Sequence, residues 1–319
     1  MDDSITAFVN SVKITDSTIL NTPNFVFLCG GRTQDSGPFL SGRDYFNRYI
    51  NANDAKLAER IKLAETINDW FDHNTFSDLL ELEAYLADFS DLIILFVESA
   101  GSIAELGAFA ASDILQPKTL AVLNSAHPME RTFIADGPVR RIKTVDEAMV
   151  LRYEWNDQDL AEAATLTEFA DMSKDLVQLL VKRATDSAKV RKFDVSSHGH
   201  IMLLIADLVE LIGITIGTEL IDCLSEWGIP VDRLRLQKYI YLLKHLRLIT
   251  TQSNASQTYY LSRASAGFIH YAFIPNTAAR DRARIKSLIR QALTTRDERR
   301  TRILQRHLAK QSKWARPNV

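Results

Sequence analysis

The chain has 319 residues, of which 46% are hydrophobic and 24% are charged, a composition typical of a globular protein with two domains of ordinary size. This balance excludes wholesale disorder. The longest strongly apolar run, residues 92–97, is too short to cross a bilayer, and the N-terminus lacks the pattern of a secretory signal. Because the two cysteines are far apart and no Cys/His cluster has zinc spacing, we expect a cytoplasmic protein with no disulfide framework, no metal site and no membrane partner.

Charge is distributed unevenly along the chain, although the formal net charge is only −2. Residues 276–319 contain 13 Lys or Arg and three Asp or Glu, so the rest of the chain is acidic. An acidic body with a basic tail indicates a polyanionic partner or attraction between chains. The alternative is a solvated helix that is merely basic.

Short apolar runs alternate with helical patterns through the first half of the chain. The runs that predict strands are residues 25–28, 61–64, 92–97, 119–123 and 149–151. Helical spacing between them covers residues 43–53, 76–89 and 103–115. Since this alternation is typical of a parallel sheet covered by helices on both faces, we predict a doubly wound α/β domain over residues 1–155.

The second half of the chain is predicted to be mainly helical. Residues 156–197 form a helical connector, and a second domain follows over residues 198–275. Its predicted elements are helices at residues 201–212, 218–227 and 232–247 and a hairpin of residues 248–252 and 257–261. Three helices followed by a hairpin predict a winged helix-turn-helix domain, and residues 276–319 are predicted to form a basic helical tail.

Two loops of small residues follow predicted strands of the first domain, one at residues 29–32 and one at residues 98–102. Open parallel sheets bind ligands beyond the carboxyl ends of their strands, and glycine lets the backbone approach a ligand closely. Neither loop is a complete GxGxxG or P-loop motif, which disfavours hydride transfer and ATP hydrolysis. The predicted substrate-binding residues are Gly30, Gly31, Glu98, Ser99, Gly101 and Ser102.

Glu105 is the candidate catalytic carboxylate. Ser102 and Glu105 have the Ser-x-x-Glu spacing of a capping box, and in that interpretation the glutamate needs no further function. In the other interpretation the first turn of the helix faces the ligand, where a carboxylate stabilises an oxocarbenium-like ribose or attacks it. Asp91, before the clearest strand, is a second catalytic candidate, and a simple junction between helix and strand is its alternative.

The segment DLIILFVESAGSIAELG, residues 91–107, resembles the nucleoside deoxyribosyltransferase-like superfamily. Members of that superfamily have a strand, a short Gly/Ser loop and a Glu-Leu-Gly helix start. In the transferases this glutamate is the nucleophile on the sugar, so the resemblance gives that role to Glu105. It matches Asp91 to an acidic position near the base. Related transferases complete their pockets with residues of a neighbouring subunit, which implies a homo-oligomer.

A second resemblance covers nearly the whole chain. Residues 27–31, 98–109, 136–140 and the C-terminal predicted winged helix are similar to retron effectors, the toxic arms of bacterial anti-phage retrons. The resemblance implies an N-glycosidase that takes NAD as substrate, with no cofactor, and releases nicotinamide and ADP-ribose. It also implies control by a reverse transcriptase with its msDNA and ncRNA. Residues 63–65 lack the proline expected beside the acid in such proteins, so Glu65 is left out of the predicted catalytic set.

The third predicted helix of the second domain combines an apolar stripe with basic residues on its other sides. Together with the tail it predicts a surface that contacts nucleic-acid phosphates. The helix lacks a dense run of Asn, Gln and Arg, so we expect it to bind the nucleic-acid backbone or a structured nucleic acid rather than to recognise a base sequence. A winged helix used only for protein contact is the alternative. The predicted nucleic-acid-binding residues are Arg235, Lys238, Arg280, Arg284, Arg299 and Arg300.

Three other functions stay open at this point. The first is hydrolysis or transfer of a base from a nucleoside or nucleotide, which uses the same chemistry. The second is a non-catalytic regulator that senses a nucleotide and binds DNA through the winged helix. The third is a structural adaptor, which would leave the glycine loop and Glu105 without a purpose.

Overall fold

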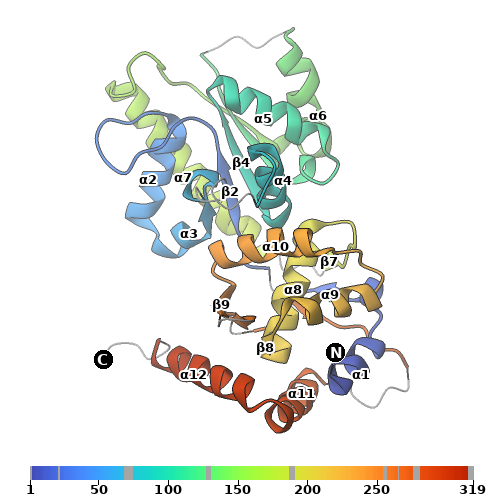
Figure 1. Cartoon of the computed structure of the whole chain (residues 1–319). Helices are drawn as coiled ribbons and strands as arrows, with labels where there is room; N and C mark the ends of the chain where they lie inside the picture. Colours follow the sequence, from blue (N-terminus) through green and yellow to red (C-terminus); the bar gives the residue numbers. More distant parts are fainter. Residues whose placement is uncertain are drawn as a thin grey trace. The chain divides into compact units, whose positions relative to one another are not determined.

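The structure is a computed structural model, and the chain forms two compact units in it (Figure 1). Unit 1 is formed by the described parts of residues 1–22, 70–77 and 190–319, and unit 2 by those of residues 23–69 and 78–189. The structure describes residues 2–20, 22–67, 75–126, 131–186, 191–253, 257–264, 266–275 and 281–314.

Unit 2 is built on a five-stranded, fully parallel sheet with the strand order β3-β2-β4-β5-β6. The central strands β4 and β5 are buried along their whole length, which is why they are continuous in apolar residues. The order is that of a doubly wound sheet whose switch point lies between β2 and β4. The strands are β2 (Val26–Cys29), β3 (Ile61–Lys62), β4 (Leu92–Val97), β5 (Thr119–Asn124) and β6 (Val150–Tyr153).

Helices lie on both faces of this sheet, with α2 and α7 on one side and α5 and α6 on the other (Figure 1). The predicted α/β class with a parallel sheet is therefore confirmed. Helix α7, predicted as part of a connector, packs on α2 within unit 2. The helices are α2 (Gly42–Asn53), α3 (Ala55–Arg60), α4 (Leu79–Phe89), α5 (Ala100–Ala111), α6 (Arg140–Val145) and α7 (Ala163–Asp186). Shorter turns are η2 (Ala64–Thr66), η3 (Gln116–Lys118), η4 (Ala135–Val139) and η5 (Glu147–Met149).

The described residues between 198 and 262 of unit 1 contain three helices and a three-stranded antiparallel sheet of order β8-β10-β9. The three helices and the hairpin predicted for this region are all present. Strand β8 is additional, since a strand of two residues carries no periodic signal in the sequence. In chain order the elements are α8 (His198–Ile212), β8 (Ile214–Thr215), α9 (Gly217–Glu226), α10 (Arg233–His245), β9 (Ile249–Ser253) and β10 (Thr258–Ser262).

The first 20 residues belong to unit 1, which differs from the predicted domain of residues 1–155. Helix α1 (Asp3–Asn10) buries Phe8 edge-on against the rings of Trp227 and Tyr271. After the turn η1 (Ile14–Asp16), strand β1 pairs with two strands from the second half of the chain. These strands are β1 (Thr18–Ile19), β7 (Arg191–Lys192) and β11 (Ile269–His270).

The basic tail forms α11 (Arg282–Arg296) and α12 (Glu298–Trp314), which pack within unit 1 rather than apart from it. On α12, Ile303 packs into a cluster with Ile214 and Tyr259 of the small sheet.

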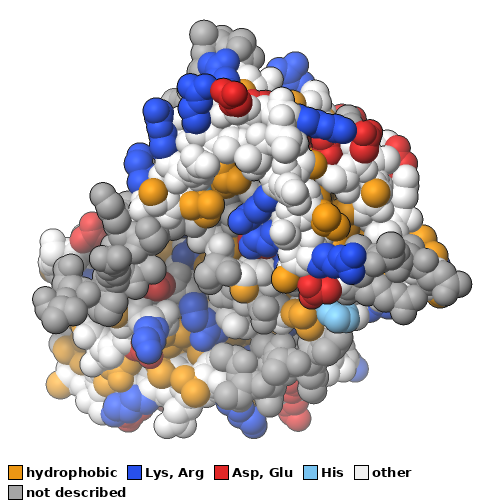
Figure 2. All heavy atoms as spheres, turned by 90° about the horizontal axis from the view of Figure 1, so that it is seen from below, with side chains coloured by type: hydrophobic (Ala, Val, Ile, Leu, Met, Phe, Trp, Pro, Cys, Tyr) orange, Lys and Arg blue, Asp and Glu red, His pale blue; other side chains and the backbone are white. Residues whose placement is uncertain are grey.

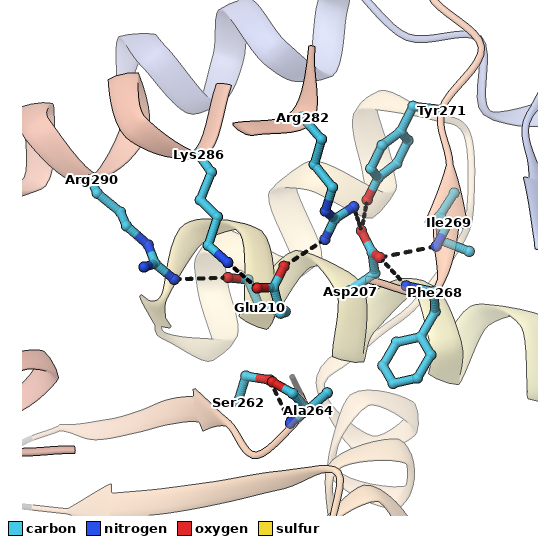
Figure 3. Close-up of polar contacts among 10 residues, drawn as sticks. All are labelled: Asp207, Glu210, Ser262, Ala264, Phe268, Ile269, Tyr271, Arg282, Lys286 and Arg290. Carbon is cyan, nitrogen blue, oxygen red and sulfur yellow. Dashed lines mark hydrogen bonds and ion pairs between the residues drawn. The ribbon is translucent and has the colours of Figure 1, made fainter. Parts of the chain in front are cut away.

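A buried acidic pair on α8 holds α11 in place (Figure 3). The carboxylate of Asp207 is fully buried and accepts hydrogen bonds from the backbone N–H groups of Phe268 (2.6 Å) and Ile269 (3.0 Å). Its other oxygen accepts from the Tyr271 hydroxyl and from Arg282 Nη1 at 3.0 Å. One turn further along α8, Glu210 pairs with Arg282 at 2.7 Å and with Lys286. Each buried charge is thus paired, as an uncompensated charge in this position would be strongly destabilising.

None of the helices in the described ranges combines the length and hydropathy needed to cross a membrane. Helix α7 has 24 residues, but charged side chains such as Glu168, Lys174 and Asp175 interrupt it.

We expect Asp207→Asn to lower the free energy of unfolding by about 3 kcal/mol, since it leaves Arg282 partly unpaired and turns an amide donor toward backbone donors. Urea unfolding followed by circular dichroism measures the effect. Asp222→Asn on the exposed side of α9 is the matched control and should change stability by less than about 0.5 kcal/mol. Equal midpoints for Asp207→Asn and the wild type would contradict the structural role of the pair.

Candidate functional site

The two predicted loops meet at the switch point of the unit 2 sheet, because β2 and β4 are neighbours and Cys29 pairs with Leu95. Gly30 has a φ of +140°, and a Cβ there would lie 2.7 Å from the Phe96 Cβ. A Cβ on Gly31 would lie 2.7 Å from the Ser41 Cβ. Both glycines are therefore required for the close approach of the β2 loop to its surroundings. Their contact with a substrate stays a prediction.

Glu98, at the end of β4, holds the start of α2. Its Oε1 accepts hydrogen bonds from the N–H groups of Gly31 and Arg43, both at 3.1 Å, and its Oε2 accepts from Gly42 N–H at 2.8 Å. Burial raises the pKa of Glu98, while these backbone donors act in the opposite direction. Because both carboxylate oxygens are occupied, the structure gives Glu98 a role in fixing the loop, and its predicted contact with substrate is untested.

Helix α5 begins earlier than the sequence suggested, with Ser99 as its N-cap. The Ser99 Oγ accepts from Ser102 N–H at 3.1 Å, and the Ser102 Oγ accepts from Ser99 N–H at 2.8 Å. This reciprocal pair is the capping box, so the interpretation that joined Ser102 to Glu105 is wrong. Ser102 is buried and holds the loop, whereas Gly101 is exposed in the first turn.

Glu105 is the sixth residue of α5, beyond the reach of the N-cap. Its side chain is half-buried, and its Oε2 has no hydrogen-bond partner among the residues that the structure describes. Burial raises the pKa of Glu105, the positive charge of Arg43 lowers it, and Glu65 raises it. A buried carboxylate oxygen without a structural partner is rare, and it leaves this group available to a ligand.

Asp91 does not join Glu105. It precedes β4, so it lies at the amino edge of the sheet, about 20 Å along the strand from the carboxyl edge. There its charge acts on Arg60. The position of Asp91 therefore fits the alternative interpretation, a residue at the junction between a helix and a strand.

Arg43 and Glu65 form an ion pair that the sequence did not predict as part of the site. Arg43 is 5% exposed, and its guanidinium lies 2.9 Å from Glu65 Oε1 and 3.0 Å from Glu65 Oε2. It also donates to the carbonyl oxygens of Leu28 (2.6 Å) and Gly31 (3.0 Å) at the end of β2. Arg43 thus joins the β2 loop to Glu65. The missing proline near Glu65 gave no information on this contact.

Glu83 on α4 is the third carboxylate of the site and is 8% exposed. Burial raises its pKa to about 7, with further increases from the charges of Glu105 and Glu65 and a decrease from Arg43. These mutual effects indicate that three glutamates share one neighbourhood with the Arg43 cation. The helical spacing of α4 could have indicated the burial of Glu83, since Glu83 lies on the same side of the helix as the buried Leu82 and Leu86.

We name Arg43, Glu65, Glu83 and Glu105 the glutamate cluster. Carboxylates with raised pKa values can donate or accept protons near neutral pH, and an ionised one can stabilise a developing positive charge. In the described part of the chain, His, Cys, Asp and Glu form no group of three or more suited to a metal ion.

The predicted nucleic-acid residues of unit 1 differ in their exposure and in their pairing. Arg284 and Arg299 are exposed, and Arg235 is exposed with one hydrogen bond to the Pro230 carbonyl. Arg300 is only 12% exposed and pairs with Glu219 at 2.7 Å, so the structure gives it a role inside the unit. Lys238 is half-buried, and Arg280 lies outside the described residues. Figure 2 shows Lys and Arg side chains at several separate places on one face, with acidic and hydrophobic ones between them.

Comparisons with known proteins place the chain in a family. A family described as STM3845 retron effector protein matches residues 40–251, more than half of the chain. An Escherichia coli protein of retron Ec86, whose name includes ribosyltransferase and DNA-binding, is 31% identical over 179 residues, 52% of this chain and 51% of that protein. The corresponding Escherichia coli protein of retron Ec73 is 30% identical over 187 residues, 56% of this chain and 58% of that protein. The chain therefore spans little more than half the length of these relatives, and it belongs to the STM3845 retron effector family.

Proposed function

We propose that this chain is the toxic effector of a retron anti-phage system, an N-glycosidase that hydrolyses NAD to nicotinamide and ADP-ribose under the control of a reverse transcriptase and msDNA. One observation carries the enzymatic part: Glu105 has a buried oxygen with no hydrogen-bond partner among the described residues, next to the switch point of the sheet. The names of the two relatives, ribosyltransferase and DNA-binding, support both halves of the proposal.

The proposed reaction breaks the bond between the ribose C1′ and the nicotinamide nitrogen. The electron pair passes to that nitrogen, which is positively charged in NAD, so nicotinamide leaves as a neutral molecule without taking a proton. Positive charge builds on the ribose ring as the bond breaks, and the Glu105 carboxylate stabilises it or bonds to C1′. Water then forms the new bond to C1′ and loses a proton, which gives ADP-ribose; where Glu105 has bonded to C1′, that bond breaks in the same step and its electron pair returns to the carboxylate.

Glu83 is the proposed acceptor of the proton from water. With a pKa of about 7 it is partly ionised at neutral pH. Arg43 lowers the pKa values of both Glu83 and Glu105, and we propose that it keeps Glu105 ionised.

The near-neutral pKa of Glu83 also favours a second candidate, the hydrolysis or transfer of a base from a nucleoside or nucleotide. A purine or pyrimidine leaves as an anion unless it is protonated, so this reaction needs a general acid. The protonated form of Glu83 supplies one. NAD cleavage uses the ionised form of the same residue, and the two reactions therefore depend on pH in opposite directions.

We also propose that α8, α9, α10 and the β9–β10 hairpin form a winged helix-turn-helix domain that binds the msDNA and ncRNA of the retron. The position of β8 between α8 and α9, paired with β10, supports this topology. Exposed Arg284, Arg299, Arg306 and Lys310 on α11 and α12 supply positive charge for phosphates. Self-association of the chain stays a prediction.

We expect Glu105→Gln to lower nicotinamide release from NAD at least about a thousandfold, because the amide cannot stabilise or attack the ribose cation as a carboxylate does. Chromatography of the products measures the release with purified protein. Glu147→Gln, an exposed glutamate of the same unit, is the control and should keep the wild-type rate. Equal release by Glu105→Gln and the wild type would end the catalytic proposal.

The pH dependence separates the two candidate reactions. With NAD, we expect kcat to rise as the pH increases through about 7, because Glu83 must be ionised to accept a proton from water. With a purine nucleotide, we expect kcat to fall over the same range, because the protonated form is required. Glu83→Gln should remove either limb. A profile that is identical in the wild type and Glu83→Gln would exclude Glu83 from proton transfer.

We expect the double substitution Arg284→Gln/Arg299→Gln to weaken binding of a single-stranded DNA oligonucleotide. It should also make the slope of log K against log salt less steep by about 1.4, since each phosphate contact on a single strand contributes about 0.7. Fluorescence anisotropy at several salt concentrations measures both. Arg152→Gln, an exposed arginine of unit 2, is the control and should leave binding unchanged. Unchanged affinity and slope in the double variant would place the nucleic-acid surface elsewhere.

A further inference from the structure

Arg32 lies on the loop that follows β2, at the carboxyl edge of the unit 2 sheet. Its side chain is exposed, and its guanidinium makes no hydrogen bond or ion pair with the residues that the structure describes. The preceding residue, Gly31, donates its N–H to Glu98 at 3.1 Å, so Arg32 adjoins the switch point of the sheet. The fold does not use the charge of Arg32, which is therefore available to a ligand.

The backbone around Arg32 is fixed, although its side chain is not. The carbonyl oxygen of Arg32 accepts a hydrogen bond from the Ser41 hydroxyl at 2.8 Å. The next residue, Thr33, donates its hydroxyl to Glu65 Oε1 at 3.1 Å, and Glu65 belongs to the glutamate cluster. The loop therefore presents Arg32 beside the cluster in a defined place, which lowers the entropy cost of binding a ligand there.

The charge of the candidate site disfavours a substrate that contains phosphates unless a cation compensates it. The glutamate cluster has three carboxylates and one guanidinium, that of Arg43, which is buried and paired with Glu65. The diphosphate of NAD is negatively charged, so the carboxylates repel it. In the described ranges, the loops at the carboxyl edge carry two basic residues, Arg32 after β2 and Arg131 after β5. Arg32 is on the loop that Thr33 joins to the cluster.

We propose that Arg32 binds the diphosphate of NAD and thereby makes the site select phosphorylated substrates over nucleosides. The inference rests on the proposed function, because it names the part of the substrate that the β2 loop recognises. A guanidinium binds a phosphate through two parallel N–H···O hydrogen bonds. The diphosphate takes no part in the bond breaking at C1′, so this contact is equal in substrate and transition state and contributes to binding rather than to turnover.

The experiment compares NAD with nicotinamide riboside, which has the same scissile bond and no phosphate. We expect Arg32→Gln to raise KM for NAD about tenfold and to leave kcat unchanged, since it removes a contact that substrate and transition state share. Nicotinamide release from the riboside should stay at the wild-type rate. Arg32→Lys, which keeps the charge and loses the planar fork, should be intermediate. Added salt should raise KM for NAD more steeply in the wild type than in Arg32→Gln.

Arg131→Gln is the matched control, because Arg131 is also exposed on a loop at the carboxyl edge. It should keep the wild-type KM for both substrates. The inference is overturned if Arg32→Gln leaves KM for NAD unchanged or impairs NAD and the riboside equally. An equal rise of KM in Arg131→Gln would overturn it as well, since the net charge of the edge rather than a contact of Arg32 would then attract the phosphates.

Binding of ADP-ribose separates this inference from the proposed function. If the wild type releases no nicotinamide from NAD, the proposed function fails, and calorimetry with ADP-ribose decides the role of Arg32. Binding about tenfold weaker in Arg32→Gln than in the wild type would support that role. Equal binding by the two proteins, or no binding by the wild type, would overturn it.

Discussion

The candidate site depends on one side chain, the Glu98 carboxylate, which accepts hydrogen bonds from three backbone N–H groups. This contact joins the end of β4 to the loop after β2 and to the first turn of α2. Arg43 lies in that turn, so the same contact sets the guanidinium between the β2 carbonyl oxygens and Glu65. The charge of Arg43 in turn moderates the pKa values of Glu83 and Glu105. Glu98, which the sequence predicted as a substrate contact, thus holds the elements of the candidate site together.

Continuous apolar runs made the parallel sheet predictable, and β4 has the predicted bounds of residues 92–97. The start of α5 was not predictable from the Ser-x-x-Glu pattern, because Ser99 satisfies the same backbone donors three residues earlier. Asp91 was grouped with Glu105 because the motif is contiguous in sequence, although a six-residue strand separates their positions in space. Arg43, Glu65 and Glu83 come from three separate elements, and a single sequence contains no signal for their proximity.

The positive charge of the tail overstated how many of its basic side chains are available to a polyanion. Arg282 and Lys286 neutralise the buried carboxylates of α8, and Arg300 neutralises Glu219, so these side chains stabilise unit 1. Only part of the basic residues, among them Arg284 and Arg299, is left on the surface for phosphates. The net charge of a sequence segment counts all of its charged side chains. Binding of a polyanion depends on the basic side chains that are not paired with acidic ones in the folded protein.

The central claim is that the Glu105 carboxylate meets the ribose C1′. A crystal structure of the Glu105→Gln variant with NAD tests it most directly, since the substitution keeps the shape of the side chain and removes its charge. The account predicts the nicotinamide riboside C1′ within about 3.5 Å of the residue 105 side chain. NAD bound away from α5, or with C1′ turned away from that side chain, would contradict it.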